Sequence, residues 1–448
     1  MLKSLHARLG DFWWYSLMLF CACRAADLLN AAVGLWLVPK YVGASELGAV
    51  MPLSSFAGFL ALPVSIFATA FMKEITVLAT HNEYGKMKSL MRGVFICAGI
   101  FLILALLTTR LVLPAFLTRI RVGEGSLGIL IVSTAFVGAI APIYSNALQA
   151  LKRFKTISLL NVISAPIRFI VMIVAMPFRA ISGYFVGQTA VPAFSIVASI
   201  WALRKELSVP AEPYWNRQVF RNFSLLLLGI GAYFYTGNIL VLAEQTILRQ
   251  RLPDIDSAAY YMATRFSDIA SFFGGTLAVV LFPFTATLAA EGKPTRPLVF
   301  KSSIATIVPS ALLAVTFYFL GRPILAILPD GDKYIEFTWA IPWLICLTSL
   351  SAIQSFHLNT EVSAGRFKFL RWWVPINLVF AAGLILVTGC GYFTDYLPKS
   401  WSDFLAVHNF TSLRAMLMWF TVTTLIKTAI SIAELLRQSP GSKTSSQT

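Results

Sequence analysis

Long apolar runs alternate with short polar segments along almost the whole chain, and this pattern predicts membrane-spanning helices. Each run holds about 20 or more residues, the length that a helix needs to cross a hydrocarbon core about 30 Å thick. The pattern predicts an all-α polytopic membrane protein of twelve spans. Their approximate bounds are 12–38, 47–72, 89–109, 126–150, 157–177, 180–203, 222–247, 259–288, 299–320, 336–360, 367–389 and 410–434.

A polar connection divides the predicted spans into two groups of six. It contains Pro210, Pro213 and two acidic residues. We therefore predict two six-helix lobes around a central cavity, and a C-terminal tail whose Ser, Thr and Gln content favours disorder. The predicted bounds are an N-terminal lobe at 1–203, a cytoplasmic connecting loop at 204–221, a C-terminal lobe at 222–434 and a disordered cytoplasmic tail at 435–448.

A short motif recurs in the two halves. Residues 146–155 and 359–368 both place an Asn seven positions before Arg-Phe-Lys, and a looser echo joins residues 83–86 to 291–293. Matches in the same order at similar offsets indicate a duplicated unit. Because each half has an even number of spans, both copies enter the membrane in the same sense. A transport site is then expected between the two parallel repeats.

Composition and charge agree with a membrane protein. Hydrophobic residues make up 57% of the chain and charged residues only 12%, against about a quarter in soluble domains. The net charge of +16 is spread over short loops, and no basic domain exists that could hold nucleic acid. With both termini inside, cytoplasmic loops carry about twice as many Lys and Arg residues as the opposite loops. We therefore predict a multi-pass protein of the inner (cytoplasmic) membrane with cytoplasmic termini.

Charged residues inside the predicted spans are the candidate functional groups. A charge at the bilayer centre costs about 2.5–3.5 kcal/mol on insertion scales, so these groups should face a cavity or each other. Arg24 with Asp27, and Arg265 with Asp268, are each three residues apart, which places both side chains on one helix face. Arg168 has no such partner nearby in its own span.

Two explanations of these charges remain open. They either form internal ion pairs that hold helices in register, or the arginines line a cavity and bind an anionic substrate. Guanidinium suits the second role because its planar fork binds phosphate oxygens through two parallel hydrogen bonds. The candidates are Arg24, Arg168 and Arg265 for substrate binding in a cationic cavity; Asp27, Asp268 and Glu244 for ion pairing or coupling; and Asn30, Asn238 and Tyr235 for secondary polar lining.

Motifs of enzyme chemistry are absent from the sequence. It contains no Walker loop, no Gly-x-Gly-x-x-Gly, no His-Glu-x-x-His and no Gly-x-Ser-x-Gly. We predict no catalytic residue, no metal site and no cofactor, and the short loops argue against a membrane glycosyltransferase or polymerase. The driving force for transport would come from a substrate gradient, an ion gradient or the membrane potential.

Several stretches resemble a known family. Residues 35–43, 148–155, 258–265 and 324–331 are similar to the polysaccharide or O-antigen flippases of the multidrug/oligosaccharidyl-lipid/polysaccharide exporter superfamily. The resemblance covers about residues 12–434. It implies a transporter that moves a polyprenyl-diphosphate-linked oligosaccharide to the outer leaflet by alternating access, for surface polysaccharide or lipopolysaccharide biosynthesis.

The same resemblance bears on site residues and partners. Lipid II flippases of the superfamily place cavity arginines in helices 1 and 8, and Arg24 and Arg265 resemble those positions. The implied partners are the lipid-linked oligosaccharide, membrane lipids and the polymerase or ligase machinery, with no nucleic acid. The alternative is a cation-coupled extruder of drugs and other small molecules, which would use buried carboxylates as its main ligands. Embedded bases slightly outnumber embedded acids here, so the residues favour the flippase.

Overall fold

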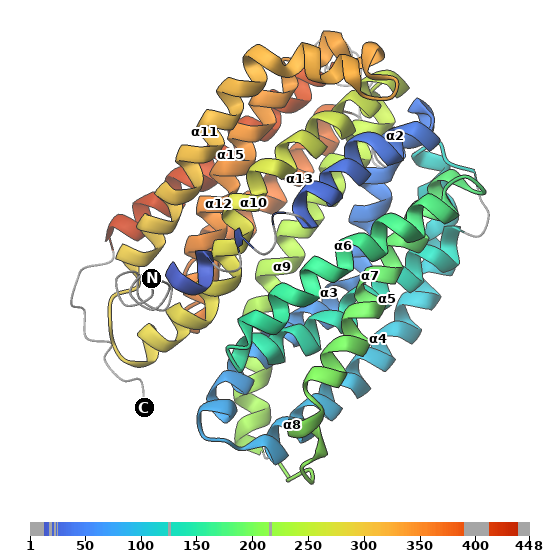
Figure 1. Cartoon of the computed structure of the whole chain (residues 1–448). Helices are drawn as coiled ribbons and strands as arrows, with labels where there is room; N and C mark the ends of the chain where they lie inside the picture. Colours follow the sequence, from blue (N-terminus) through green and yellow to red (C-terminus); the bar gives the residue numbers. More distant parts are fainter. Residues whose placement is uncertain are drawn as a thin grey trace.

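The computed structural model describes residues 13–17, 20–21, 24, 26–123, 127–214, 217–388 and 412–437. Within them, all regular elements are helices, and ten are long and apolar enough to cross a membrane, with the shorter α13 beside them (Figure 1). This confirms the predicted fold class. The helices are η1 (Val33–Leu37), α2 (Val38–Tyr41), α3 (Ala44–Thr80), α4 (Tyr84–Arg119), α5 (Leu127–Ala150), α6 (Phe154–Ala175), α7 (Ala180–Ala202), α8 (Arg204–Ser208), α9 (Arg217–Arg251), α10 (Asp254–Ala290), α11 (Arg296–Ile327), η2 (Gly331–Phe337), α12 (Ala340–Ser363), α13 (Leu370–Thr388) and α15 (Leu413–Arg437).

Several helices continue beyond the predicted spans. α3 and α10 each have 37 residues, which gives a length of about 55 Å at 1.5 Å per residue. Hydropathy marks the part of a helix that faces lipid, whereas the backbone hydrogen bonds continue into the polar ends. The segment predicted as a connecting loop, residues 204–221, contains the short helix α8 and the start of α9. Part of the first span, residues 389–411 and the tail from 438 lie outside the described residues.

The helices of each half pack mainly on one another. In the first half α3 packs on α5, and α7 packs on both α5 and α6. In the second half α12 contacts α10, α11 and α15, while α9 lies along α13. The halves meet where α3 contacts α9 and α10, near the middle of Figure 1.

The apolar core is divided by depth rather than by half. One buried cluster includes Val42 and Leu252, beside the turns at 42–43 and 252–253. We call the end of the molecule where these turns lie the opposite face, because it lies opposite the basic face defined next. The other includes Leu203 and Val299 and lies toward the turns at 81–83, 151–153 and 291–295; we call that end the basic face, which the sequence predicts to be cytoplasmic. Each cluster draws on both halves. Along α3 the boundary falls between Ala57 and Leu62, near the middle of the helix.

The repeated motif forms the same turn in both halves. The residue before the arginine is left-handed in each copy, with φ of 54° at Lys152 and 70° at Gly365. The amide of the arginine then donates to the carbonyl five residues earlier, at 2.9 Å from Arg153 and 2.8 Å from Arg366. This is the hydrogen bond of a Schellman helix end. The sequence echo therefore corresponds to a shared backbone turn.

The segment that joins the halves is attached to the first half at the basic face. Tyr214 donates from its hydroxyl to Glu74 Oε2 at 2.8 Å, and Lys88 Nζ donates to the carbonyl of Val209 at 3.0 Å. Burial and the bond to Glu74 raise the pKa of Tyr214 above its usual range, so its hydroxyl stays a donor at neutral pH. The segment is thereby fixed to α3 and α4 before the chain enters α9.

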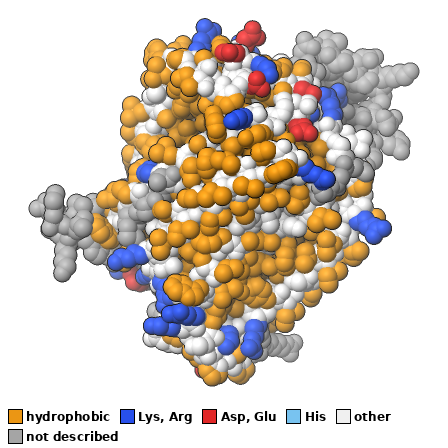
Figure 2. All heavy atoms as spheres, turned by 45° about the vertical axis from the view of Figure 1, so that its right-hand side comes forward, with side chains coloured by type: hydrophobic (Ala, Val, Ile, Leu, Met, Phe, Trp, Pro, Cys, Tyr) orange, Lys and Arg blue, Asp and Glu red, His pale blue; other side chains and the backbone are white. Residues whose placement is uncertain are grey.

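The outer surface is apolar across its middle. Figure 2 shows hydrophobic side chains covering a broad band, with Lys and Arg gathered toward the two ends. Leu111 on α4 and Phe319 on α11 are 80% and 72% exposed, exposures that water would disfavour but lipid accepts. The band therefore fits a surface that contacts the hydrocarbon of a bilayer.

One close contact between helices gives a test of this packing. A Cβ added at Gly183 of α7 would lie 2.6 Å from the backbone of Ala175 and Met176, at the end of α6. We expect Gly183→Ala to destabilise the protein by about 1–3 kcal/mol, as overpacking does. Gly99→Ala is the control, because its Cβ meets nothing within 4 Å. Thermal unfolding in detergent measures both, and equal melting temperatures would contradict the α6–α7 packing.

Candidate functional site

A cavity of about 530 Å³ lies where the two apolar clusters meet. Its walls come from α3, α5 and α7 of the first half and from α9 and α10 of the second. Small and apolar residues predominate, and the polar groups include Arg265, Gln188, Asn238 and Tyr184. A mostly apolar pocket of this size with a few convergent polar groups is typical of a small-molecule site.

Arg265 on α10 places a guanidinium in the cavity wall. Its Nη1 pairs with Asp268 Oδ2 at 2.9 Å, and its Nη2 lies 2.9 Å from the sulfur of Met51. The guanidinium also lies 5.1 Å from the ring centre of Tyr261. Gly34 makes room for this side chain, because a Cβ there would lie 2.8 Å from Arg265 Cδ. Asp268 therefore orients Arg265 and balances its charge, as the three-residue spacing predicts.

Arg168 on α6 lies outside the cavity wall and is connected to it through Gln188, while its other partner, Asn30, is not part of the wall either. Its Nη1 donates to Asn30 Oδ1 at 3.2 Å, and its Nη2 donates to Gln188 Oε1 at 3.0 Å. Gln188 in turn donates to the hydroxyl of Tyr184 at 2.7 Å. Among the described atoms, the buried Nε of Arg168 has no hydrogen-bond partner. The recorded partners of Arg168 are thus neutral amides, which leave its positive charge in place.

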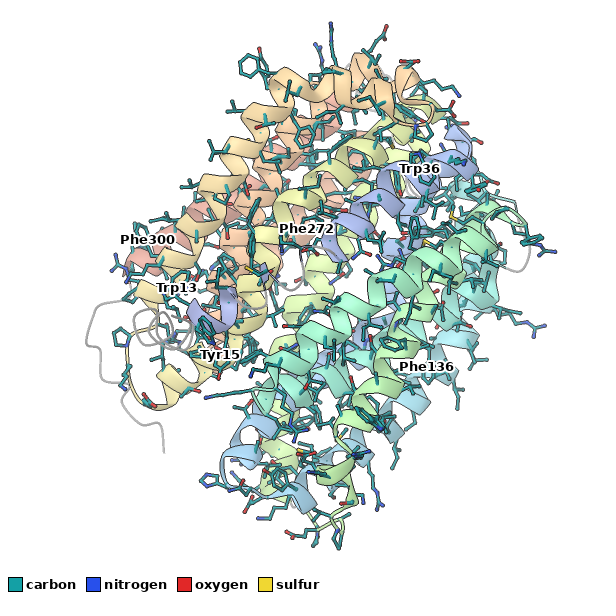
Figure 3. All side chains as sticks on the ribbon, viewed as in Figure 1. Trp13, Tyr15, Trp36, Phe136, Phe272 and Phe300 are labelled. Carbon is teal, nitrogen blue, oxygen red and sulfur yellow. The ribbon has the colours of Figure 1, made fainter. Side chains whose placement is uncertain are left out.

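Arg24 and Asp27 form the second predicted pair, at 2.6 Å. Arg24 also donates to the carbonyl of Phe272 at 3.2 Å and lies 3.8 Å from the ring centre of Phe20. Phe272, labelled in Figure 3, belongs to α10. The hydrogen bond from Arg24 therefore connects the first span to the second half. Neither Arg24 nor Asp27 is part of the wall of the cavity described above.

The three candidates on α9 lie in different surroundings. Asn238 is part of the cavity wall, and its Nδ2 donates to the carbonyl of Phe234 at 2.9 Å. Tyr235 instead meets the ring of Phe59 edge-on, with the ring centres 5.9 Å apart. Tyr235 and Glu244 both lie outside the wall. Of the three, only Asn238 contributes to this cavity.

The residues that sequence reasoning missed are uncharged. Gln188 and Tyr184 line the cavity and link it to Arg168, and Thr134 of α5 lies beside them in the wall. Gln188 lies in an apolar span, where a side-chain amide needs a hydrogen-bond partner. This feature of the sequence could have identified Gln188 as a candidate site residue. Within the described residues, no three His, Cys, Asp or Glu side chains are grouped so that they could hold a metal ion.

Several solved structures share this helix arrangement. The Vibrio cholerae MATE transporter VcmN aligns with a TM-score of 0.63 at 14% identity, over 97% of both chains. An inward-facing multidrug resistance MATE family transporter of the MOP superfamily gives 0.59 at 12% identity, over 94% of this chain and 98% of that chain. An outward-facing one gives 0.62 at 13%, over 96% and 98%. The chain has the MATE fold.

The MATE fold agrees with the superfamily that the sequence predicts. It comprises two lobes of six helices, as the pattern of spans indicates. The neighbours are named as MATE or multidrug transporters, whereas the sequence motifs favour an oligosaccharide flippase. No protein-family model and no curated protein matches the sequence. The class of substrate therefore has to be inferred from the residues of the cavity.

Proposed function

We propose that this chain is a membrane transporter that extrudes small amphiphilic molecules by alternating access, with the cavity as its substrate site. The observation that carries the proposal is the position of the cavity, at mid-depth, with walls from both halves. A rocking motion of the halves would open such a site to one face and then to the other. The MATE fold, known in inward-facing and outward-facing forms, supports this mechanism.

Cavity volume and charge define the class of substrate. A volume of about 530 Å³ falls within the 300–1,000 Å³ that drug-sized ligands occupy. Arg265 brings one positive charge to the wall, where Asp268 balances it, and Arg168 holds a second positive charge behind Gln188. The remaining charge attracts a cargo that carries one acidic group. The favoured substrate is therefore a small amphiphilic organic acid, moved by an ion gradient or the membrane potential without an enzymatic step.

A lipid-linked oligosaccharide is the second candidate cargo. Two guanidinium groups near one cavity favour it, because arginine forks match the oxygens of a diphosphate. In that case the diphosphate would bind near Arg168 and Arg265, the first sugars would occupy the cavity and the prenyl tail would remain in lipid. The polymerase and ligase machinery of polysaccharide assembly would then be its partners. For either cargo we propose a protein of the inner membrane with both termini in the cytoplasm, as the distribution of Lys and Arg over the loops predicts.

Transport by the purified protein in liposomes distinguishes these cargoes. The three probes are a fluorescent amphiphilic carboxylic acid, its uncharged amide and a fluorescent polyprenyl-diphosphate oligosaccharide, each under an ion gradient and under a membrane potential. We expect movement of the acid, and movement of the amide at least about tenfold slower because it lacks the charge. Movement of the oligosaccharide alone would establish the flippase instead. Failure of all three probes to move would contradict transport.

A further inference from the structure

A chain of hydrogen bonds leads from Arg168 to the wall of the cavity. Arg168 Nη2 lies 3.0 Å from Gln188 Oε1, and Gln188 Nε2 lies 2.7 Å from the hydroxyl oxygen of Tyr184. Gln188 and Tyr184 are part of the cavity wall, whereas Arg168 is not. The chain therefore begins at a positive charge behind the wall and ends at a phenol hydroxyl in the wall.

The direction of each hydrogen bond in this chain follows from its first member. A guanidinium has donors and no acceptor, so Gln188 has to turn its carbonyl oxygen toward Arg168. The amide nitrogen of Gln188 then faces Tyr184 and donates to the hydroxyl oxygen. A hydroxyl carries a single hydrogen, and in Tyr184 this hydrogen is not used in the bond with Gln188. It therefore points away from Gln188.

The hydrogen of the Tyr184 hydroxyl is left for a group in the cavity. Tyr184 is only 4% exposed, and within the part of the chain that the structure describes its hydroxyl accepts from Gln188 and donates to no protein group. Thr134, another hydroxyl of the wall, is different. Its Oγ1 lies 2.7 Å from Thr189 Oγ1 and 2.8 Å from the carbonyl oxygen of Leu130, so its hydrogen is used within the protein. A buried hydroxyl that keeps its hydrogen calls for an acceptor from outside the protein.

The charge of Arg168 strengthens the donor at the end of the chain. Hydrogen bonds in series polarise one another, so a cation that donates to Gln188 makes the amide N–H a stronger donor, and the amide does the same for the hydroxyl of Tyr184. Arg168 forms no ion pair within the described residues that would cancel this effect. An anionic oxygen is the acceptor that binds such a donor most strongly.

We propose that the hydroxyl of Tyr184 binds the acidic group of the cargo, and that Arg168 and Gln188 keep this hydroxyl a donor. This role of Tyr184 rests on the proposed function, since it requires an acidic cargo in the cavity. Arg265, the arginine of the wall, is already paired with Asp268 at 2.9 Å. Selectivity for acids then comes from an uncharged donor with a cation behind it.

Tyr184→Phe removes the hydroxyl and keeps the ring. The fluorescent carboxylic acid should bind the purified full-length variant in detergent about tenfold to a hundredfold more weakly, because one hydrogen bond to a charged group is lost. The primary amine with the same carbon skeleton should not lose affinity. Tyr318→Phe is the matched control, because Tyr318 of α11 is 72% exposed on the outer surface, and this variant should bind the acid as the wild type does.

The wild type separates failure of this role from failure of the proposed function. Acid that the wild type binds and moves, with equal affinity in a folded Tyr184→Phe variant, would overturn the role of Tyr184 and leave the proposed function standing. A wild type that neither binds nor moves the acid would overturn both.

Gln188→Glu reverses the last hydrogen bond of the chain. A carboxylate has no N–H, so it accepts from both Arg168 and Tyr184, and the lone pairs of the Tyr184 hydroxyl then face the cavity. The new carboxylate also balances the charge of Arg168. Acid binding should fall and amine binding should rise, each by about tenfold. A purely structural role of the chain predicts instead that both probes bind more weakly.

The double variant Gln188→Glu with Tyr184→Phe shows which group binds the amine. Without the hydroxyl, the gain in amine binding should largely disappear. A gain of equal size in the single and the double variant would mean that the new carboxylate binds the amine directly, and it would overturn the role of Tyr184. If variants with Tyr184→Phe do not fold, an unchanged preference for acid over amine in Gln188→Glu would overturn it as well.

Discussion

Replacing Arg168 with methionine is expected to slow the transport of an acidic cargo by about tenfold to a hundredfold. Hydrogen bonds to charged groups contribute about 1.5–3 kcal/mol each, and every 1.4 kcal/mol corresponds to a factor of ten. Arg168 donates to the neutral amides of Asn30 and Gln188 and forms no ion pair within the described residues, so its charge can act on an acidic cargo on the other side of Gln188. Methionine fills a similar volume but donates no hydrogen bond. The measurement is the initial flux into liposomes at equal protein content.

Two further variants test whether the loss of flux comes from the charge of Arg168 and from its position. Arg168→Lys keeps the charge but not the planar fork, so its flux should fall between those of wild type and Arg168→Met. Arg24→Met removes an arginine that Asp27 neutralises and that, unlike Arg168, does not donate to a residue of the cavity wall, so it should reduce flux less. An unchanged flux in Arg168→Met would remove this residue from the site. A greater loss in Arg24→Met would move the anion site toward the first span.

Arg249→Met is expected to destabilise the protein by about 2–6 kcal/mol, because it leaves two carbonyl groups without their donor, at about 1–3 kcal/mol for each buried acceptor. The Arg249 side chain is completely buried. It donates to Asp254 Oδ1 at 2.7 Å, to the carbonyl of Ser45 at 2.7 Å and to that of Ile120 at 3.1 Å. These bonds join the end of α9 to the ends of α3 and α4, across the two halves at the opposite face.

A second arginine on the same aspartate is the matched control. Arg121 Nη1 lies 3.3 Å from Asp254 Oδ1, but its side chain is 51% exposed. Exposed ion pairs contribute about 0–1 kcal/mol, so Arg121→Met should change the melting temperature little. Thermal unfolding in detergent compares the two variants. Equal melting temperatures would mean that the contacts of Arg249 do not hold the halves together at this face.

The positions of the spans could be predicted from the sequence, but the ends of the helices could not. α3 is predicted to stop near residue 72, yet it continues to Thr80. The apolar run ends where lipid ends, while the backbone remains helical through polar residues. The burial of Arg249 could not be predicted either. The pattern of spans puts Arg249 in a loop between spans on the side opposite the cytoplasm, whereas in the structure its side chain is completely buried against the ends of α3 and α4. Only tertiary packing determines that burial.

The candidate site was predicted in part. The spacing of Arg265 and Asp268 correctly indicated an ion pair, because residues three apart share a helix face. Periodicity does not show which neighbouring helix covers that face, so it could not separate Arg265, in the cavity wall, from Arg24, outside it. Gln188 was missed because neutral polar residues in membrane helices commonly serve packing alone.

The substrate class was the least predictable property. The sequence motifs favour an oligosaccharide flippase, whereas the structures with this fold are named as MATE or multidrug transporters. These neighbours share 12–14% identity with the chain, which establishes the fold but not the cargo. In our proposal the cargo depends on a few side chains, chiefly Arg265 in the cavity wall and Arg168 behind Gln188, that the overall helix arrangement does not determine.

The most direct test of a transport site that opens in turn to both sides of the membrane is the accessibility of Ser54 from each side. Ser54 lies in the cavity wall on α3, and Ser54→Cys can be introduced after the five native cysteines are replaced by serine. In liposomes of uniform orientation, a membrane-impermeant thiol reagent is supplied outside or enclosed inside. Alternating access predicts labelling from both sides, slowed on both by saturating cargo. Labelling from one side only, under every gradient and cargo condition, would contradict a transport site between the halves.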